Sequence, residues 1–437
     1  MRRFSVIPFF LFLLVQGKAQ QVLTLENVIE AALNNNYDIR MARNDSASYA
    51  LDRSYAYAAF LPRLNGTAGR TWNVNAQKQE LSNGTKRDTT GIRSNNINAS
   101  LGLNWTLFDG LKMFATRDKL EEFEQLGTLG IKNQVVNTVA SVINTYYGIV
   151  RQKQQLRAIE EQISINEERV KLADRKLSVG LGSKPELLQA KVDLNAQIAS
   201  RLQQRTLIAQ LREQLNQLVG FTSDATYDVT DSIPINTSLE YGELQQNLEA
   251  TNPALLITQK NISLARLTLK ERKGELFPTL SFNSSYNFSR TQNKVVINNF
   301  TPLFNQNRGF NYGFSLAIPI FNGFNTRRLI RQTELDIQYQ QLLYGNQLSM
   351  VNVGLSTAYK DYQLQKELLQ LEEENIALAR ENVFIALERF RQGVSTYLEL
   401  REAQRSLEDG YNRLIAARYN TKLAETELLR LKGDLVR

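Results

Sequence analysis

The sequence predicts an α+β membrane protein whose chain contributes four transmembrane β-strands and two long α-helical coiled-coil hairpins. Three observations support this fold class. The second half of the 437 residues repeats the first at a nearly fixed spacing. Each half contains two segments in which apolar and polar residues alternate, which is typical of strands. Each half also contains long segments with an apolar residue at every seventh position, which is typical of coiled coils.

Residues 1–19 have the features of a secretory signal peptide. Two arginines precede an apolar run, Phe4–Val15, which is followed by the small-x-small pattern Gly17-Lys18-Ala19. We therefore expect the mature chain to begin near Gln20. The apolar run is shorter than the roughly 20 residues that a membrane-spanning helix needs, and no later segment qualifies as one.

Composition excludes several classes of chemistry. The chain contains no cysteine and no histidine, so disulfides, thiol catalysis, the Ser-His-Asp triad and the common zinc sites are ruled out. Three of the 52 basic residues lie in the signal peptide, which leaves 49 basic against 44 acidic residues in the mature chain. An excess this small, spread along the chain, does not indicate nucleic-acid binding. We expect no catalytic residues, no cofactor and no metal site.

The internal repeat defines the organisation of the chain. Leu107–Gly110 and Leu215–Gly220 return 213 positions later, as Ile320–Gly323 and Leu428–Gly433. Upstream the spacing is 216, because Pro62 matches Pro278, and a variable loop between strands is where such a change belongs. The predicted divisions are a signal peptide at 1–19, a first repeat at 20–220, a linker at 221–241 and a second repeat at 242–437.

Four segments alternate apolar with small or polar residues, starting near Leu64, Ile97, Leu280 and Phe310, and the last alternates as far as Ile320. Each is about as long as the roughly 10 residues of a tilted membrane strand. Arg70 interrupts the apolar face of the first segment. Both tryptophans, Trp72 and Trp105, lie on apolar faces, where an aromatic girdle would place them; an ordinary protein core is the alternative.

The helical segments carry heptad stripes. A strict seven-residue spacing makes helices supercoil left-handedly around their neighbours. The helix expected over residues 111–177 would be roughly 100 Å long at 1.5 Å per residue. Two antiparallel helical hairpins per chain follow. The stripes comprise Val135, Val142, Ile149, Leu156, Ile163, Val170 and Leu177, and Leu348, Leu355, Tyr362, Leu369, Ile376, Val383 and Phe390.

Four strands cannot form a closed membrane barrel alone. Every backbone amide must be paired inside lipid, so an open sheet needs strands from other chains. Two copies would give eight strands and an interior filled by side chains, whereas three would give twelve and leave room for water. The small polar residues on the second face of each strand suit a water-filled lumen.

The turns at 179–183 and 392–396 read Val-Gly-Leu-Gly-Ser and Gln-Gly-Val-Ser-Thr, and each precedes a heptad helix. With these turns, the duplicated halves and the prolines at 62 and 278, the chain resembles the TolC family of outer-membrane efflux channels over essentially its mature length. The resemblance implies a homotrimer with a 12-stranded barrel in outer-membrane lipid and an α-helical tunnel through the periplasm. It also implies docking to a periplasmic adaptor and an inner-membrane RND or ABC transporter.

The resemblance also assigns roles at the hairpin turns. Acidic residues after the turns would narrow the entrance and bind cations, and the matching positions are Glu186, Glu399 and Glu402. Ser183-x-x-Glu186 and Thr396-x-x-Glu399 are also capping boxes, so helix capping is the alternative for two of these acids. A latch arginine of the best-known member is Ser395 here, so its contacts do not transfer. The adaptor-docking turns would comprise Gly180, Leu181, Gly182, Ser183, Gly393, Val394, Ser395 and Thr396.

We therefore expect a passive export channel that is not an enzyme. The alternative is a periplasmic coiled-coil scaffold without channel activity, in which the strands would form a soluble sandwich. The exported substrate and the energy source of the partner pump do not follow from the sequence.

Overall fold

The computed structural model describes residues 21–222, 227–295 and 300–435, so the predicted signal peptide lies outside the described residues. The chain divides into two compact units. Each unit combines segments from both halves of the sequence, whereas the repeat boundaries divide the chain along its length and stay a prediction. The first unit comprises Met1–Asn44, Gly130–Leu256 and Leu348–Arg437, and the second comprises Asp45–Leu129 and Ile257–Gln347.

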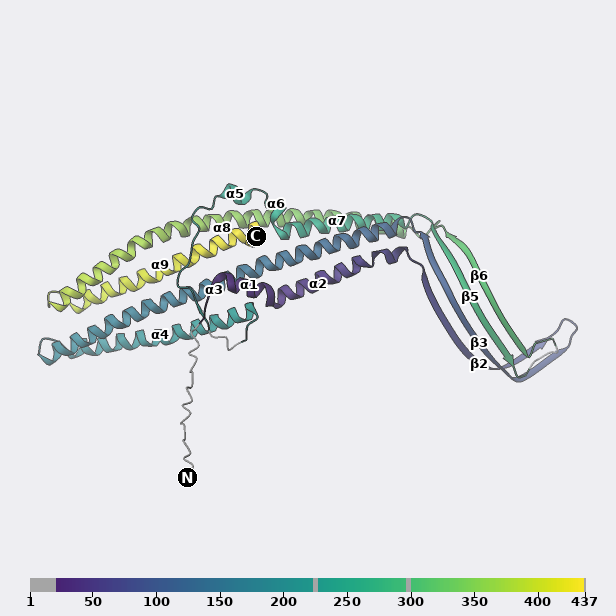
Figure 1. Cartoon of the computed structure of the whole chain (residues 1–437), viewed down its shortest axis with the longest axis horizontal. Helices are drawn as coiled ribbons and strands as arrows, with labels where there is room; N and C mark the ends of the chain where they lie inside the picture. The colour runs from purple at the N-terminus through teal and green to yellow at the C-terminus, as the bar shows by residue number, and fades with distance from the viewer. Residues whose placement is uncertain (1–20, 223–226, 296–299, 436–437) are drawn as a thin grey trace, which may run out of the picture. The chain divides into compact units, whose positions relative to one another are not determined.

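The second unit contains a four-stranded antiparallel sheet in the order β2-β3-β5-β6 (Figure 1). Its strands are β2 (Arg63–Glu80), β3 (Lys86–Phe108), β5 (Thr279–Asn293) and β6 (Phe304–Ala317). They are 14 to 23 residues long, well above the usual 5 or 6, which confirms the prediction of four long strands.

The two strand hairpins of this sheet have the same register. Arg63 lies opposite Asn104 in the first hairpin, and Thr279 lies opposite Ala317 in the second. These positions differ by 216 on the first strand and 213 on the second, which are the spacings of the sequence repeat. The repeat is therefore structural as well as sequential.

The prediction that the last strand alternates as far as Ile320 was wrong. β6 ends at Ala317, and the backbone from Ile318 to Phe321 is not in a strand. Pro319 has no N–H to donate to a neighbouring strand, so the ladder ends before it.

A tight turn joins β3 to the long helix α3 (Lys112–Ser178). Gly110 and Leu111 both have positive φ, 74° and 69°. A Cβ on Gly110 would lie 2.1 Å from the carbonyl oxygen of Gly274, at the end of α7 (Pro253–Gly274). The positive φ and this close contact therefore both require glycine at position 110. The short helices α2 (Tyr37–Ser54) and η1 (Ala56–Phe60) precede β2.

The long helices repeat residue for residue. α3 and α8 (Asn325–Arg391) each have 67 residues, and α4 (Lys184–Val219) and α9 (Tyr397–Lys432) each have 36. Every boundary shifts by 213 between the halves, which confirms the two predicted hairpins. In the part of the chain that the structure describes, no helix is both long and apolar enough to cross a membrane.

The core of the first unit forms around the heptad stripes. Val142, Ile149 and Leu355 are fully buried, as are Leu215 and Leu428 on the return helices. A two-stranded parallel sheet of β1 (Gln21–Leu23) and β4 (Tyr227–Val229) packs here with α1 (Leu25–Asn35). The helices α5 (Tyr241–Gln245) and α6 (Leu248–Thr251) complete the unit.

Candidate functional site: the polar sheet face and the hairpin turns

One face of the four-stranded sheet is polar and hollowed. The hollow has a volume of about 550 Å³ and crosses all four strands. Hydrogen bonds between side chains connect neighbouring strands on this face. Asn104 Nδ2 donates to Asn283 Oδ1 (2.6 Å), and Asn283 Nδ2 donates to Ser315 Oγ (2.9 Å). The described residues that line it carry no charge at neutral pH; they are Asn65, Thr67, Ser100, Gly102, Leu103, Asn104, Asn283, Ser284, Ser285, Asn311, Tyr312 and Gly313. Of these, Leu103, Ser284 and Tyr312 belong to the opposite face by strand alternation.

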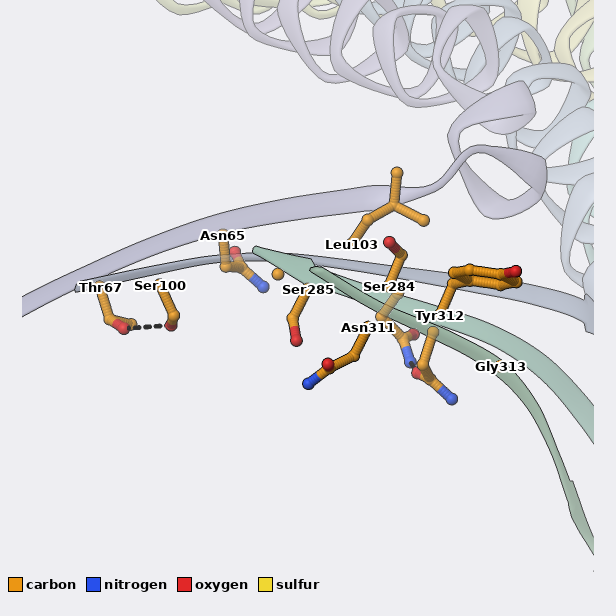
Figure 2. Close-up of a pocket in the computed structure, with 12 residues that line it drawn as sticks. Asn65, Thr67, Ser100, Leu103, Ser284, Ser285, Asn311, Tyr312 and Gly313 are labelled. Atoms are coloured by element: carbon orange, nitrogen blue, oxygen red, sulfur yellow. Dashed lines mark hydrogen bonds between the residues drawn. The ribbon is translucent and has the colours of Figure 1, made fainter. Parts of the chain in front are cut away.

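Figure 2 shows how strand alternation separates the two faces. Ser285 and Asn311 point to the same side as the hydrogen-bonded pair Thr67 and Ser100, whose hydroxyl oxygens are 2.8 Å apart, while Leu103 and Tyr312 do not. Amide and hydroxyl groups can exchange hydrogen bonds with water and with many solutes without favouring either sign of charge. This face is suited to pass hydrated solutes rather than to bind one of them.

The turn from α3 to α4 and the turn from α8 to α9 have the same backbone geometry. The N–H of Gly180 donates to Leu177 O and that of Leu181 to Lys176 O, a Schellman motif that requires positive φ at the glycine. The second turn repeats both bonds around Gly393, whose φ of 75° is close to the 78° of Gly180. Both glycines are therefore explained by the turn itself.

The acids that follow the turns divide into two kinds. Ser183 and Glu186 form a complete capping box, since each side chain accepts from the backbone N–H of the other. Thr396 Oγ1 accepts from Glu399 N, but the reciprocal bond to the Thr396 backbone is absent from the hydrogen bonds described for this turn. Glu402 is exposed and has no recorded partner among the described residues. Cation binding by Glu402 stays a prediction.

The turns expose apolar side chains. Leu181 is 82% exposed, and Val394 and Val179 are about two-thirds exposed. Ser395 differs, because it is buried and its hydroxyl has no partner among the described residues. The apolar tips are thus available to another protein, whereas Ser395 offers it little surface. The docking and entrance roles of these turns stay predictions.

A polar cluster near the turns was not predicted from the sequence. Arg169 on α3 is almost fully buried; it donates to Asp193 Oδ2 on α4 (2.6 Å) and to Gln404 Oε1 on α9 (2.8 Å). Tyr397 Oη also donates to Asp193 Oδ2 (2.9 Å), and Gln189 donates to its other oxygen (2.8 Å). The cluster therefore joins both hairpins of the chain. The sequence does contain a signal for this cluster, because Arg169 is a charged residue directly before the stripe residue Val170.

The environment of this cluster fixes its protonation. Burial alone would raise the pKa of Asp193, but hydrogen bonds from Gln189, Tyr397 and Arg169 and the charge of Arg169 outweigh it and hold the pKa below its usual 3.8. Burial and the hydrogen bond to Asp193 raise the pKa of Tyr397. At neutral pH the cluster is thus an ionised carboxylate held by a cation and a neutral phenol.

The two tryptophans lie on the apolar face of the sheet. Trp72 is 67% exposed and Trp105 is 39% exposed, while the Trp105 indole N–H donates to Phe60 O (2.8 Å). Neither tryptophan is buried in the single chain as a core tryptophan would be. The aromatic girdle stays a prediction for both.

The sequence also matches a known family. The model of the family described as outer membrane efflux protein matches residues 28–221 and 244–434, one match for each half of the chain. The chain belongs to the outer membrane efflux protein family. It is accordingly an outer-membrane efflux channel of the kind that serves tripartite efflux and type I secretion systems, extends into the periplasm and catalyses no reaction. The scaffold alternative is set aside.

Curated relatives cover nearly the whole of this efflux channel. The outer membrane efflux protein BepC of Brucella suis is 22% identical over 96% of this chain and 87% of its own length. The outer membrane protein TolC of Vibrio cholerae is 20% identical over 90% and 86%. The cation efflux system protein CusC of Escherichia coli K12 is 24% identical over 94% and 86%.

Solved structures share the fold. The outer-membrane channel OprN matches with a TM-score of 0.77 at 17% identity, covering 94% of this chain and 90% of its own. The outer membrane protein VceC of Vibrio cholerae matches with a TM-score of 0.76 at 16% identity, covering 94% and 96%. These matches confirm the predicted α+β fold of four antiparallel strands and long helical hairpins.

Proposed function

We propose that three copies of this chain form one 12-stranded conduit, which receives its solutes through a periplasmic adaptor and an inner-membrane RND or ABC transporter. Members of the family form trimeric channels with tripartite efflux partners. The pump supplies the energy and selects the solute, while this chain supplies the path.

The observation that carries the proposal is a second heptad stripe on α8. The stripe found in the sequence is buried inside the chain, with Leu355 and Tyr362 almost fully covered. On another face of the helix, a stripe with the same spacing, in which Thr357 takes one position, has apolar residues that are 38–66% exposed: Leu343, Met350, Leu364, Leu371, Leu378 and Ile385. An apolar heptad stripe is stabilised when another helix covers it. Another copy of the chain supplies such a helix.

The sheet needs the same partner. β2 and β6 are its outer strands, and each has one unpaired edge. In lipid the unpaired groups would cost several kcal/mol each, so a closed ring of copies is required. Three copies rather than two fit the polar face, because an eight-stranded barrel is filled by its side chains, whereas twelve strands enclose water.

The hairpin turns support a docking role. Their exposed apolar residues Leu181 and Val394 suit an adaptor, and Glu402 stands one helical turn beyond Glu399. In a trimer Glu402 would occur three times around the axis, where like charges favour a bound cation.

The mass of the protein in mild detergent, corrected for bound detergent, tests the assembly. Three chain masses from purified outer membranes support the proposal. One chain mass, or absence from the outer membrane, overturns it. Capture of the adaptor by the intact assembly, compared with capture by a Leu181→Ser and Val394→Ser variant of the same mass, tests the docking role.

A further inference from the structure

Five exposed basic side chains lie on the apolar face of the sheet, toward the strand ends that are joined by loops rather than by helices. Strand alternation places them on the face that carries Trp72. They are Arg70 on β2, Arg93 on β3, Arg290 and Lys294 on and just after β5, and Arg308 on β6. No acidic residue occurs in the four-stranded part of the sheet, which comprises residues 63–75, 92–108, 279–294 and 304–317.

The basic residues begin where an apolar band ends. On the apolar face of β5, no charge occurs from Leu280 to Phe288, and the next residue on that face is Arg290. Leu280 and Phe288 are eight positions apart, which is roughly 27 Å of strand and about 21 Å of membrane depth at a tilt near 40°. The lipid-facing band of a membrane barrel is about 25 Å tall. The basic residues therefore lie at the depth of lipid headgroups.

Charges elsewhere around the sheet occur as pairs of opposite sign. At the helix end, Lys112 Nζ lies 3.8 Å from Glu275 Oε1, and in the tip of the β2–β3 hairpin Lys78 Nζ lies 2.8 Å from Asp88 Oδ2. Among the described residues, no ion pair includes any of the five basic residues of the apolar face. Anionic headgroups at a membrane surface supply the missing opposite charge.

Strand pairing brings two of these cations together. The backbone N–H of Lys294 donates to Arg93 O (2.8 Å), which extends the pairing of β3 and β5 by one residue and makes the two residues direct neighbours. The Cβ atoms of such neighbours are about 4.5–5.5 Å apart, and like charges at this distance destabilise a sheet. An anion bound between the two side chains would remove the repulsion.

A hollow of about 280 Å³ lies beside this pair. One ordered water needs only about 10–15 Å³, so the space is sufficient for a lipid headgroup. Two of its lining residues, Asn73 and Ser94, belong to the opposite face by strand alternation. On the apolar face the hollow is lined by Trp72, Val74, Arg93, Asn95 and Lys294.

Arg70 is held at the edge of this hollow. Its guanidinium lies over the Trp72 ring, 4.8 Å from the centroid, and its Nε donates to Asn95 Oδ1 (3.0 Å). Stacking uses the flat face of a guanidinium, so the terminal nitrogens of Arg70 keep their N–H groups for an oxyanion. This contact also gives a reason for a charge within the apolar face of β2.

We propose that this hollow binds the phosphate group of a lipid in the outer leaflet, with Arg93 and Lys294 as its main ligands and Arg70 donating from the edge. Arginine binds phosphate through two parallel N–H bonds, and lysine adds a compact charge. The hollow opens on the apolar face beside Trp72 and Val74, which acyl chains would cover, so the phosphate is that of a lipid. The inference rests on the proposed conduit, in which the loop ends of the strands reach the outer leaflet.

Lipid binding by the assembly in mild detergent tests the proposal. The probe is a diphosphorylated glucosamine-disaccharide lipid, the comparison is the same lipid with its phosphates removed, and native mass spectrometry measures the lipid retained. We expect the wild type to bind the phosphorylated form at least about tenfold more tightly, because one hydrogen bond between charged groups is worth about that factor. Arg93→Gln with Lys294→Gln should lose at least about tenfold in affinity for the phosphorylated form.

The matched control is Lys78→Gln with Lys86→Gln, which removes the same two positive charges from exposed positions in the tip of the β2–β3 hairpin. This control should bind the lipid as the wild type does. The melting temperature of each variant without lipid is compared with that of the wild type, so that a loss of binding is not a loss of folding. Added lipid should raise the melting temperature of the wild type and the control more than that of Arg93→Gln with Lys294→Gln.

Four results would overturn the proposal. Equal losses in the two double variants would show a long-range attraction by net charge. Equal binding of the two forms of the lipid, or full binding by Arg93→Gln with Lys294→Gln, would show that the phosphate does not occupy the hollow. Inorganic phosphate that binds as tightly as the lipid would assign the hollow to a free ion.

Failure of the proposed conduit is a separate outcome. The residues that line the hollow all belong to one chain, so the hollow does not depend on the number of copies. A single chain mass in detergent would overturn the conduit, whereas binding of the phosphorylated lipid by that single chain would still support the hollow as its site.

Discussion

Arg169 Nη2 on α3 lies 2.6 Å from Asp193 Oδ2 on α4, and the Arg169 side chain is only 2% exposed. Removing one partner of a buried pair leaves an uncompensated charge. We expect Asp193→Asn to lower the free energy of unfolding by about 2–4 kcal/mol, which thermal or urea denaturation in detergent measures.

The control for this variant is Glu160→Gln, which breaks the ion pair with Arg205 on the same two helices. Both of those side chains are about half exposed, so a change below about 1 kcal/mol is expected. Equal losses in the two variants would show that burial of Arg169 is not the cause.

Acid should weaken the same contact. The pKa of Asp193 is lower in the folded chain than its usual 3.8, so its contribution to stability is present above that value and is lost as the pH falls through the folded pKa. The difference in melting temperature between wild type and Asp193→Asn should therefore shrink below about pH 4. A difference that stays constant from pH 7 to pH 3 would contradict this origin of the stability.

Alanine substitutions at two equivalent glycines separate the cost of backbone strain from the cost of a steric clash. Gly110 and Gly323 both have positive φ, but a Cβ on Gly110 would meet Gly274 O at 2.1 Å, whereas one on Gly323 meets nothing within 4 Å of its own chain. Gly323→Ala should lower the free energy of unfolding by about 1–2 kcal/mol, from backbone strain alone. Gly110→Ala should lower the free energy of unfolding by about 1–3 kcal/mol more, because the backbone must also shift to relieve the contact with Gly274. Similar melting temperatures for the two variants would refute the close contact.

The entrance role of the acids can be separated from helix capping. Glu402→Gln should reduce the block of channel conductance by divalent cations while leaving the melting temperature unchanged, because Glu402 has no recorded partner among the described residues. Glu186→Ala should lower stability by about 0.5–2 kcal/mol, since it removes half of a capping box. Planar-bilayer recordings with and without magnesium give the first readout. An unchanged block in Glu402→Gln would exclude this residue as the cation site.

The exposed stripe of α8 should control assembly. Leu371→Ser with Leu378→Ser removes apolar surface that is more than half exposed in the single chain, so the chain should fold and yet fail to reach three chain masses. Gln363→Ser with Gln370→Ser, which changes two exposed polar residues on a different face of the same helix, is the control. Normal assembly of the double variant, measured by mass in detergent, would show that another surface joins the copies.

Periodic features of this chain were predictable and isolated contacts were not. The helix predicted over residues 111–177 matches α3 to within a residue at each end, and its heptad stripe extends from Val135 to Leu177. The end of β6 was missed because Pro319 breaks the ladder without breaking the alternation. Asp228 was visible in the linker, but its bond to Lys153 (2.8 Å) depends on where the segment crosses α3, which no local pattern encodes. The partner of Arg169 lies 24 positions away and depends in the same way on how α3 and α4 align.

The open edges of β2 and β6 have a thermodynamic consequence. A solitary chain in lipid would leave two rows of backbone groups without hydrogen bonds, so the inserted monomer is not a stable species. Entry into the bilayer and association are then one equilibrium rather than two, and its free energy depends on how many chains share the membrane. Dilution with lipid should weaken this fold as effectively as heat does.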